Sequence, residues 1–121
     1  SLARNYGLEH AEKEWILVLD ADEAVDGKER EKIRAAIAEK DADAFFVTIK
    51  NFTDDAHADG FIPAPVIGHG RRYAGFYGSQ AIRLFRNSRS FSFSGIGHEL
   101  IEPSITKAAG KIRNSGILIC H

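Results

Sequence analysis

The chain has 121 residues, of which 44% are hydrophobic and 27% are charged, so it can form one domain with a modest core and lacks the composition of a disordered protein. Its formal net charge of −1 provides no general attraction to nucleic acid or to a membrane surface. No apolar run is long enough to span a bilayer. The single cysteine, Cys120, excludes an internal disulfide and fits a reducing compartment, so we expect a cytoplasmic location.

The first two predicted elements are a helix and a strand. Residues 3–13 place Ala3, Leu8 and Ala11 among polar residues, which is a weak helical pattern. Residues 15–19, WILVL, are apolar throughout and bounded by charged residues. This pattern is typical of a strand that is buried on both faces, as in a parallel sheet.

A second helix and a second strand follow. Residues 27–39 carry apolar side chains at helical spacing, with Asp26 as the expected N-cap and Glu29 three residues later, close to a capping box. Residues 44–52, AFFVTIKNF, are aromatic and β-branched and therefore predict a strand. The order helix, strand, helix, strand is typical of an α/β sheet with crossover helices.

The second half of the chain predicts a long loop and then short strands. Residues 53–79 contain a segment rich in glycine, proline and aspartate, and a loop of this length in a compact domain is usually functional or mobile. We expect it to be too short to separate two domains, so that residues 1–121 form a single domain. The short strands are expected within residues 80–87, 90–95, 98–105 and 111–121.

A cluster of acids follows the first predicted strand. Asp20, Asp22 and Glu23 lie within four residues, and like charges this close repel one another. In an open α/β sheet, ligands bind at the carboxyl ends of the strands, and carboxylate oxygens suit Mg²⁺ or Mn²⁺, which keep open positions for substrate phosphates. The alternative is a cluster that begins a helix and is favoured by its dipole. An EF-hand calcium loop is excluded because its glycine and closing glutamate are not at the required spacing.

Four stretches, in this order, resemble landmarks of the family 2 glycosyltransferases of the GT-A fold. In residues 3–23, an ARN helix leads into a strand that ends in a DxD motif at residues 20–22. RLFRN at 83–87 and GIGHE at 95–99 resemble later motifs of a subgroup, and His121 falls where that subgroup has a histidine after a strand. The resemblance implies an α/β fold with a partial GT-A (nucleotide-diphospho-sugar transferase-like) mixed sheet and flanking helices.

The resemblance also implies that part of the family domain is absent. The chain begins just before ARN and stops at His121, where relatives continue. We therefore expect the carboxy-terminal portion of a GT-A glycosyltransferase domain, without the amino-terminal part that holds the nucleotide base. An interior strand at residues 15–19 would then lack one neighbour, and its open edge would invite pairing with another chain. We expect a homo-oligomer formed around residues 3–19 that binds nucleotide-sugar poorly.

The activity implied by the resemblance is transfer of a sugar from a nucleotide-sugar donor to an acceptor of unknown identity. A divalent metal, Mn²⁺ or Mg²⁺, would neutralise the charge of the leaving diphosphate. Asp22 is the expected metal ligand, and Asp20 would assist directly, through water, or by holding the ribose instead. His121 is the candidate third ligand, with a disordered terminal residue as the alternative.

Several basic and polar residues are candidates for binding the donor. Arg4 and Asn5 match the RN of the family motif, and ordinary positions on a helix surface are the alternative. Arg83 and Arg86 could engage phosphates or be solvated charges on a strand. The expected donor-binding residues are Arg4, Asn5, Asp20, Arg83 and Arg86.

The catalytic base is expected in the GHE motif. If the transfer inverts the anomeric centre, a carboxylate must deprotonate the acceptor hydroxyl, and Glu99 is the candidate, with His98 beside it on the acceptor side. Adjacent side chains of a strand point to opposite faces. Both residues can face the cleft only if a turn forms, which Gly95 and Gly97 allow. A surface position for Glu99 is the alternative.

Other classes of protein were weighed against this interpretation. Residues 69–78, HGRRYAGFYG, combine basic and aromatic side chains, but the segment is short and the net charge gives no support to a nucleic-acid partner. Stacking on acceptor sugars or plain loop packing is expected there instead. A phosphotransfer or hydrolytic enzyme would need a P-loop or a nucleophile motif, which we do not find. A non-catalytic interaction domain that retains the glycosyltransferase scaffold is the alternative function, and membrane association is conceivable only for a longer parent protein.

Overall fold

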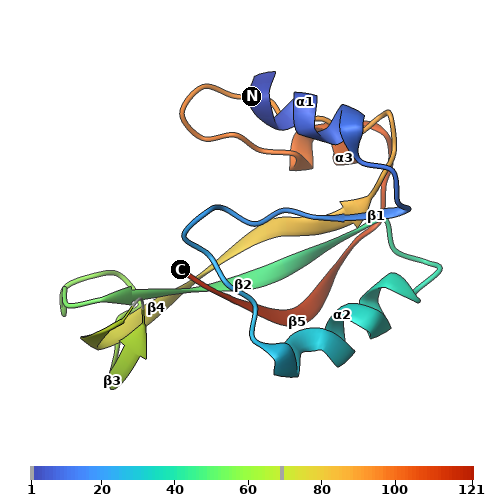
Figure 1. The fold of residues 1–121 in the computed structure, drawn as a ribbon. Helices are drawn as coiled ribbons and strands as arrows, with labels where there is room; N and C mark the ends of the chain where they lie inside the picture. Colours follow the sequence, from blue (N-terminus) through green and yellow to red (C-terminus); the bar gives the residue numbers. More distant parts are fainter. Residues whose placement is uncertain (1, 69) are drawn as a thin grey trace.

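The computed structural model describes residues 2–68 and 70–121 and contains a five-stranded mixed sheet with helices on both faces (Figure 1). The strands pair in the order β1-β4-β2-β5, and β3 also pairs with β4. This is an α/β architecture with a mixed sheet and flanking helices, as the sequence predicts. The strands are β1 (Trp15–Leu17), β2 (Ala44–Thr53), β3 (Ile62–Gly68), β4 (Arg71–Arg86) and β5 (Ile112–Cys120).

Three of the strands run in the same direction, so their carboxyl ends point toward the same end of the sheet. Strand β4 is antiparallel to both β1 and β2, whereas β5 is parallel to β2. Strands β1, β2 and β5 therefore run the same way. The prediction of a strand buried on both faces at residues 15–19 is wrong, because β1 is three residues long, half-buried, and paired antiparallel to β4 at the edge of the described sheet. Self-association through this edge stays a prediction.

The helices form a layer on each face of the sheet. Helix α2 (Arg30–Ile37) lies on one face and follows a short 3₁₀ turn, η1 (Gly27–Glu29), whereas α1 (Leu2–His10) and α3 (Glu102–Lys107) lie on the other face (Figure 1). The predicted helix at residues 27–39 is confirmed, and the one at residues 3–13 is confirmed with an earlier end. Among the described residues, no helix has both the length and the apolar character needed to cross a membrane.

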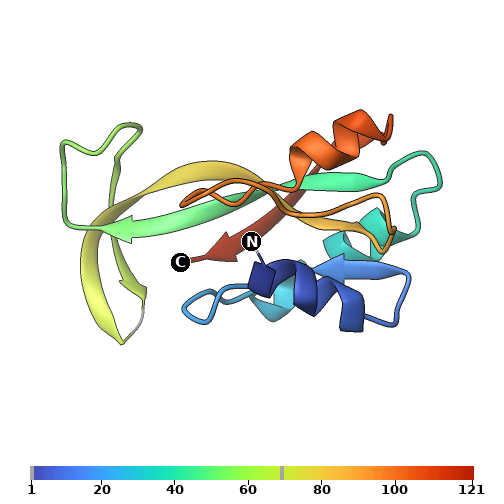
Figure 2. The ribbon, with the colours of Figure 1, turned by 90° about the horizontal axis from the view of Figure 1, so that it is seen from above.

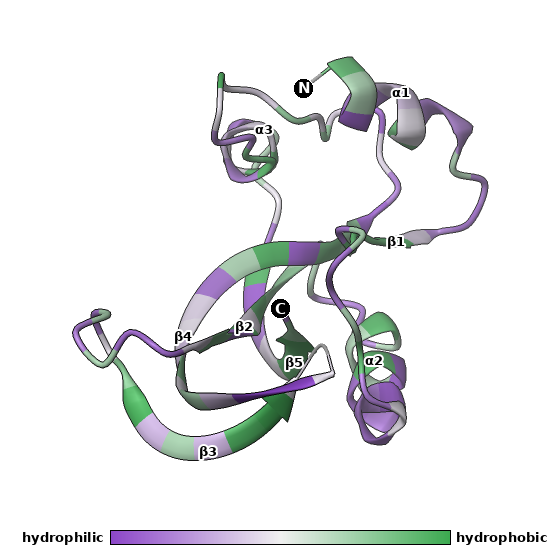
Figure 3. Cartoon of the chain, turned by 60° about the vertical axis from the view of Figure 1, so that its left-hand side comes forward, coloured by the Kyte–Doolittle hydropathy of each residue, from purple (hydrophilic) through white to green (hydrophobic). Residues whose placement is uncertain are grey.

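Two clusters of buried side chains join these layers. Helix α2 carries both hydrophilic and hydrophobic residues (Figure 3), as expected for a helix with one face on a sheet. The cluster on the α2 side contains Ala36, Ala42, Phe45, Val47, Ile49, Leu84, Ile117 and Ile119. The cluster beneath α1 and α3 contains Ala44, Ile82, Phe85, Phe91, Phe93, Ile101 and Ile105.

A β-bulge in β4 interrupts the regular alternation of faces. Phe45 pairs with Leu84, but the next residue, Phe46, pairs with Ile82, so Arg83 is an extra residue on β4. Ile82 and Phe85, three positions apart, consequently belong to the same core cluster. Bulges often redirect a side chain beside a functional site, and this one changes the direction of Arg83.

The predicted loop at residues 53–79 is wrong over most of its length. Strands β3 and β4 form a hairpin there, which extends beyond the helices together with the end of β2 (Figure 2). Residues 70–78 belong to its turn and to β4, whereas His69 lies outside the described residues. The glycines have a packing role: a Cβ on Gly75 would lie 2.2 Å from the Ile62 carbonyl oxygen, so only glycine permits this approach of the strands.

Two of the short strands predicted in the second half are also wrong. Residues 90–95 form no strand apart from a single bridge between Ser94 and Leu100. Residues 98–105 lead instead into helix α3, whose first turn contains Glu102 and a proline, both of which favour a helix start. The strands expected within residues 80–87 and 111–121 are confirmed as the end of β4 and as β5.

Glu29 joins the helical layer to the sheet and is only 2% exposed. Its carboxylate accepts hydrogen bonds from the backbone N–H of Leu118 at 2.7 Å and from Lys32 Nζ at 3.1 Å. The capping-box interpretation of Glu29 is therefore wrong, because its carboxylate is turned toward β5. Asp26 does cap this turn, since its side chain accepts from the backbone N–H of Lys28 at 3.0 Å.

Replacing Glu29 with alanine should lower the free energy of unfolding by about 1–3 kcal/mol, because the backbone N–H of Leu118 would lose its acceptor in a buried position. Urea unfolding followed by circular dichroism measures the change. Glu31→Ala is the matched control, since the Glu31 side chain is 81% exposed, and it should cause a much smaller loss. Equal losses in the two variants would contradict the assigned role of Glu29.

Candidate functional site

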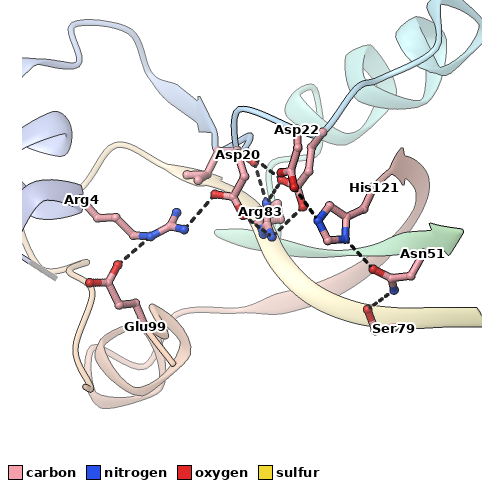
Figure 4. Close-up of polar contacts among 10 residues, drawn as sticks. Arg4, Asp20, Asp22, Asn51, Ser79, Arg83, Glu99 and His121 are labelled. Atoms are coloured by element: carbon pink, nitrogen blue, oxygen red, sulfur yellow. Dashed lines mark hydrogen bonds and ion pairs between the residues drawn. The ribbon is translucent and has the colours of Figure 1, made fainter. Parts of the chain in front are cut away.

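The acidic cluster forms a tight turn at the carboxyl ends of β1 and β5 (Figure 4). The backbone N–H of Glu23 donates to the Asp20 carbonyl at 3.0 Å, and the backbone N–H of Asp20 donates to Glu23 Oε1 at 2.7 Å. Ala24 then exchanges two backbone hydrogen bonds with Cys120, of 2.9 and 2.8 Å. The turn, called the acidic turn below (residues 20–23), is therefore held against the last residues of β5.

Arg83 reaches the acidic turn from the bulge in β4. Its guanidinium pairs with both carboxylate oxygens of Glu23, including an Nη2–Oε2 distance of 3.1 Å, and lies 3.5 Å from Asp20 Oδ2. The side chains of Arg83 and Glu23 are only 15% and 2% exposed. The Arg83 backbone carbonyl also accepts from the N–H of Val18 at 2.8 Å. In this structure Arg83 thus holds the acidic turn on the sheet, and phosphate binding by this residue stays a prediction.

Arg4 connects the acidic turn to the GHE motif. Its Nη2 lies 2.8 Å from Asp20 Oδ1 and its Nε lies 2.7 Å from Glu99 Oε2 (Figure 4). The guanidinium also lies over the ring of Phe93, 5.4 Å from its centroid. Burial lowers the pKa of Arg4, but the hydrogen bonds and charges of Asp20 and Glu99 outweigh it, so the pKa is raised above its ordinary value. Arg4 is therefore a fixed positive charge between two carboxylates.

The loop that carries Glu99 is curved, as the pair of glycines allows. Gly95 has a φ of 107° and lies so close to the chain that a Cβ would come within 2.5 Å of the His98 carbonyl oxygen. The side-chain amide of Asn5 holds the start of this loop, since it donates to the Phe93 carbonyl at 3.0 Å and accepts from the Phe93 N–H at 2.7 Å. Glu99 consequently faces Arg4, and the adjacent His98 is exposed.

The terminal His121 is ordered and meets the acidic turn. Its Nε2 lies 2.9 Å from Asp22 Oδ2, and its Nδ1 lies 2.9 Å from Asn51 Oδ1 (Figure 4). The side chains of Asp22 and His121 are 65% and 43% exposed, so a ligand from solvent can reach both. Asn51 is not among the residues selected from the sequence, because it is one of several polar residues in β2 and no motif distinguishes it.

The expected ligand set of Asp20, Asp22 and His121 does not converge in this arrangement. Asp20 is turned toward Arg4 and Arg83. Only two of the three expected metal ligands, Asp22 and His121, therefore face one another. Among the described residues, no group of three or more His, Cys, Asp or Glu side chains could hold a metal ion. A cation bound here would need water and substrate oxygens for its other positions, which is the usual arrangement of Mg²⁺.

Arg86, the other arginine of the RLFRN motif, lies elsewhere. Its Nε donates to the Ala42 carbonyl at 3.0 Å, and its Nη2 donates to the Glu39 carbonyl at 3.2 Å. Its guanidinium also lies 4.6 Å from the centroid of the Trp15 ring. These contacts join β4 to the segment that enters β2, at the opposite end of β2 from Asn51.

Cavities lie beneath α1 and beside the GHE loop, and two of them bear on the site. One, of about 170 Å³, is lined by residues that include Arg4, Arg83, Phe93 and Glu99, which is room for about five water molecules. A larger cavity of about 750 Å³ lies between α1 and residues 87–92. We regard the smaller cavity as the relevant one because Arg4, Arg83 and Glu99, which contact one another or the acidic turn, line it.

The mixed sheet with helices on both faces is that of a partial GT-A fold, and the acidic turn lies at the carboxyl ends of its strands. A family model described as glycosyl transferase family 2 matches residues 1–101. Because this match covers most of the chain, the chain belongs to that family, which confirms the resemblance of the sequence motifs. Strand β5 and His121 lie outside the matched range. No curated protein sequence gives a significant match to the chain.

Substituting Arg83 with methionine should lower the free energy of unfolding by about 3–5 kcal/mol, because it leaves the buried Glu23 carboxylate without its cation. Glu23→Leu should cost less, because Arg83 keeps Asp20 at 3.5 Å. The double variant should lose much less than the sum. A double-mutant cycle by urea unfolding measures this coupling.

The matched control is the pair Arg71–Asp54, whose side chains are 53% and 54% exposed and which should show little or no coupling. If the Arg83–Glu23 coupling were as small as that of the exposed pair, the account of Arg83 as the anchor of the acidic turn would fail.

Proposed function

We propose that this chain carries the metal-binding and acceptor side of an enzyme that transfers a sugar from a nucleotide-sugar to an acceptor. Family membership supports glycosyl transfer in general. One observation supports the more specific proposal of a metal-dependent transfer. The Asp22–His121 pair and the chain of charges Asp20–Arg4–Glu99 both start from the acidic turn. The identities of the sugar and the acceptor are left to experiment.

The chemistry of Asp22 and His121 fits a divalent cation. The Asn51 side chain accepts from His121 Nδ1, so in the neutral ring the lone pair of Nε2 faces an Asp22 oxygen 2.9 Å away. Two electron-rich atoms at this distance repel unless a positive charge lies between them. Carboxylate oxygen and imidazole nitrogen are both accepted ligands of Mn²⁺, and oxygen is preferred by Mg²⁺.

Asp22 and His121 would hold the metal. The bound metal would neutralise the charge that develops on the leaving diphosphate. Arg4 lies on the other side of Asp20 and stays positively charged. The guanidinium can therefore exchange one of its carboxylate partners for a phosphate oxygen, since phosphate and carboxylate accept the same pair of N–H groups. This gives Arg4 the donor-binding role.

Glu99 is the candidate base for an inverting transfer. The adjacent guanidinium of Arg4, 2.7 Å away, favours the ionised carboxylate, which is the form that accepts a proton. Glu99 lines the cavity of about 170 Å³ together with Phe93. This cavity is smaller than a typical ligand pocket, so it suits the part of an acceptor that carries the reacting hydroxyl. The exposed His98, next to Glu99 in the chain, would contact the remainder.

Asp22→Asn should weaken Mn²⁺ binding at least tenfold and reduce turnover in the full-length protein, because it removes the only carboxylate that faces His121 among the described residues. Calorimetry with Mn²⁺, followed by a panel of nucleotide-sugars, measures binding. Asp59→Asn, in the exposed loop before β3, is the control and should change neither quantity. Full turnover in a chelator, or in Asp22→Asn, would exclude the metal proposal. A folded full-length protein that binds no nucleotide-sugar would favour an interaction domain.

Glu99→Gln keeps the shape of the side chain and removes its basicity. Turnover of the full-length protein should fall by about 10²–10⁴-fold, while the affinity for the donor changes little. Glu31→Gln, on α2 with a side chain that is 81% exposed, is the matched control and should retain turnover. A loss below about threefold in Glu99→Gln would assign this residue a structural role as the partner of Arg4.

A further inference from the structure

Asn51 has a side-chain amide whose orientation is determined by its surroundings. Its Nδ2 lies 3.2 Å from the Ile49 carbonyl oxygen, 3.4 Å from the Tyr77 carbonyl oxygen and 3.1 Å from Ser79 Oγ. Carbonyl oxygens accept hydrogen bonds and cannot donate them. Exchanging the nitrogen and oxygen of the amide would turn Asn51 Oδ1 toward two carbonyl oxygens, so the orientation with Nδ2 as the donor is the one that the network selects.

This orientation decides which nitrogen of His121 carries a hydrogen. Asn51 Oδ1 only accepts, and His121 Nδ1 lies 2.9 Å from it, so Nδ1 must donate. The backbone of His121 is fixed as well, because its N–H donates to the Lys50 carbonyl at 2.9 Å and its carbonyl accepts from the Phe52 N–H at 3.3 Å. In the neutral ring, the lone pair is therefore on Nε2, beside Asp22 (Figure 4).

We propose that Asn51 is a positioning residue, which holds the His121 ring with its hydrogen on Nδ1 and so presents the Nε2 lone pair, beside Asp22, to a divalent cation. The proposal rests on the proposed function only in assigning the cation. Groups that orient a metal-binding histidine through its second nitrogen typically change metal affinity by about 10–100-fold when they are removed. Asn51 lies on β2, which pairs with β5, and His121 directly follows β5. The pairing of these two strands therefore sets the position of Asn51 relative to His121.

The rival explanation is an imidazolium that donates from both nitrogens, to Asn51 and to Asp22. It satisfies the same two contacts, and it differs from the proposal in the number of ring hydrogens. The proposal predicts one ring hydrogen on His121 in the metal-free protein, and the rival explanation predicts two.

Nitrogen NMR of the histidine rings in the metal-free chain, recorded at alkaline pH, distinguishes these states. The chain has five histidines, and the His121 signals are assigned by their loss in His121→Gln. The expected result is one hydrogen on His121, bound to Nδ1. A neutral ring with its hydrogen on Nε2, or a doubly protonated ring at that pH, would overturn the proposal.

Titration of Mn²⁺, followed by the spin-resonance signal of the free ion, measures the consequence for metal binding. Asn51→Leu should weaken the affinity by about 10–100-fold and release the ring to the form in which Nε2–H donates to Asp22. Asn51→Val, with a side chain favoured in strands, provides a second test if the leucine variant folds poorly. The matched control is Asn114→Leu, in an exposed position of β5, which should keep the wild-type affinity.

The two measurements separate this proposal from the proposed function. An unchanged Mn²⁺ affinity in folded Asn51 variants would overturn the role of Asn51 while leaving the metal site in place. A wild-type chain with the hydrogen on Nδ1 but no affinity for Mn²⁺ would overturn the metal assignment, and with it the cation part of this proposal.

Discussion

The arrangement of this domain depends on neutralising three carboxylates that follow a single short strand. Two like charges about 4 Å apart repel by about 1 kcal/mol in water and by about 4 kcal/mol near a protein surface, so Asp20, Asp22 and Glu23 need positive partners. Glu23 is the most buried of the three side chains, at 2% exposed, and its partner is accordingly the most buried of the cations. Arg4 of α1 and Arg83 of β4 are the positive partners of Asp20 and Glu23. Asp22 instead faces His121 after β5, where a divalent cation is the proposed positive charge.

The strand directions and one bulge make this neutralisation geometrically possible. Because β4 lies between β1 and β2 and runs against both, and β5 is parallel to β2, the carboxyl ends of β1 and β5 point toward the same end of the sheet. The extra residue in β4 is Arg83 itself, so the irregularity delivers the guanidinium to the acidic turn without disturbing the core on either side. Asp22 is the most exposed of the three acids, with 65% of its side chain accessible, so a nucleotide-sugar could reach it.

Much of this fold follows from local patterns, whereas the site depends on contacts between distant residues. The helical periodicity at residues 27–39 and the β-branched run at 44–52 predict their elements correctly, and the apolar run before Asp20 correctly locates the acids at a strand end. Glycine-rich residues 70–78 predict a loop because local sequence cannot reveal that Gly75 must approach a neighbouring strand. Likewise, Glu29 bonds to a residue 89 positions away and His121 to one 99 positions away, and no local propensity contains such pairings.

The measurement that tests the central claim most directly is pulsed electron spin resonance of Mn²⁺ bound to the chain. If the edge of the sheet forms a metal centre from Asp22 and His121, the bound ion must show magnetic coupling to one imidazole nitrogen, and this coupling must disappear in His121→Gln. Bound Mn²⁺ without nitrogen coupling, or with a coupling that persists in that variant, would contradict the account.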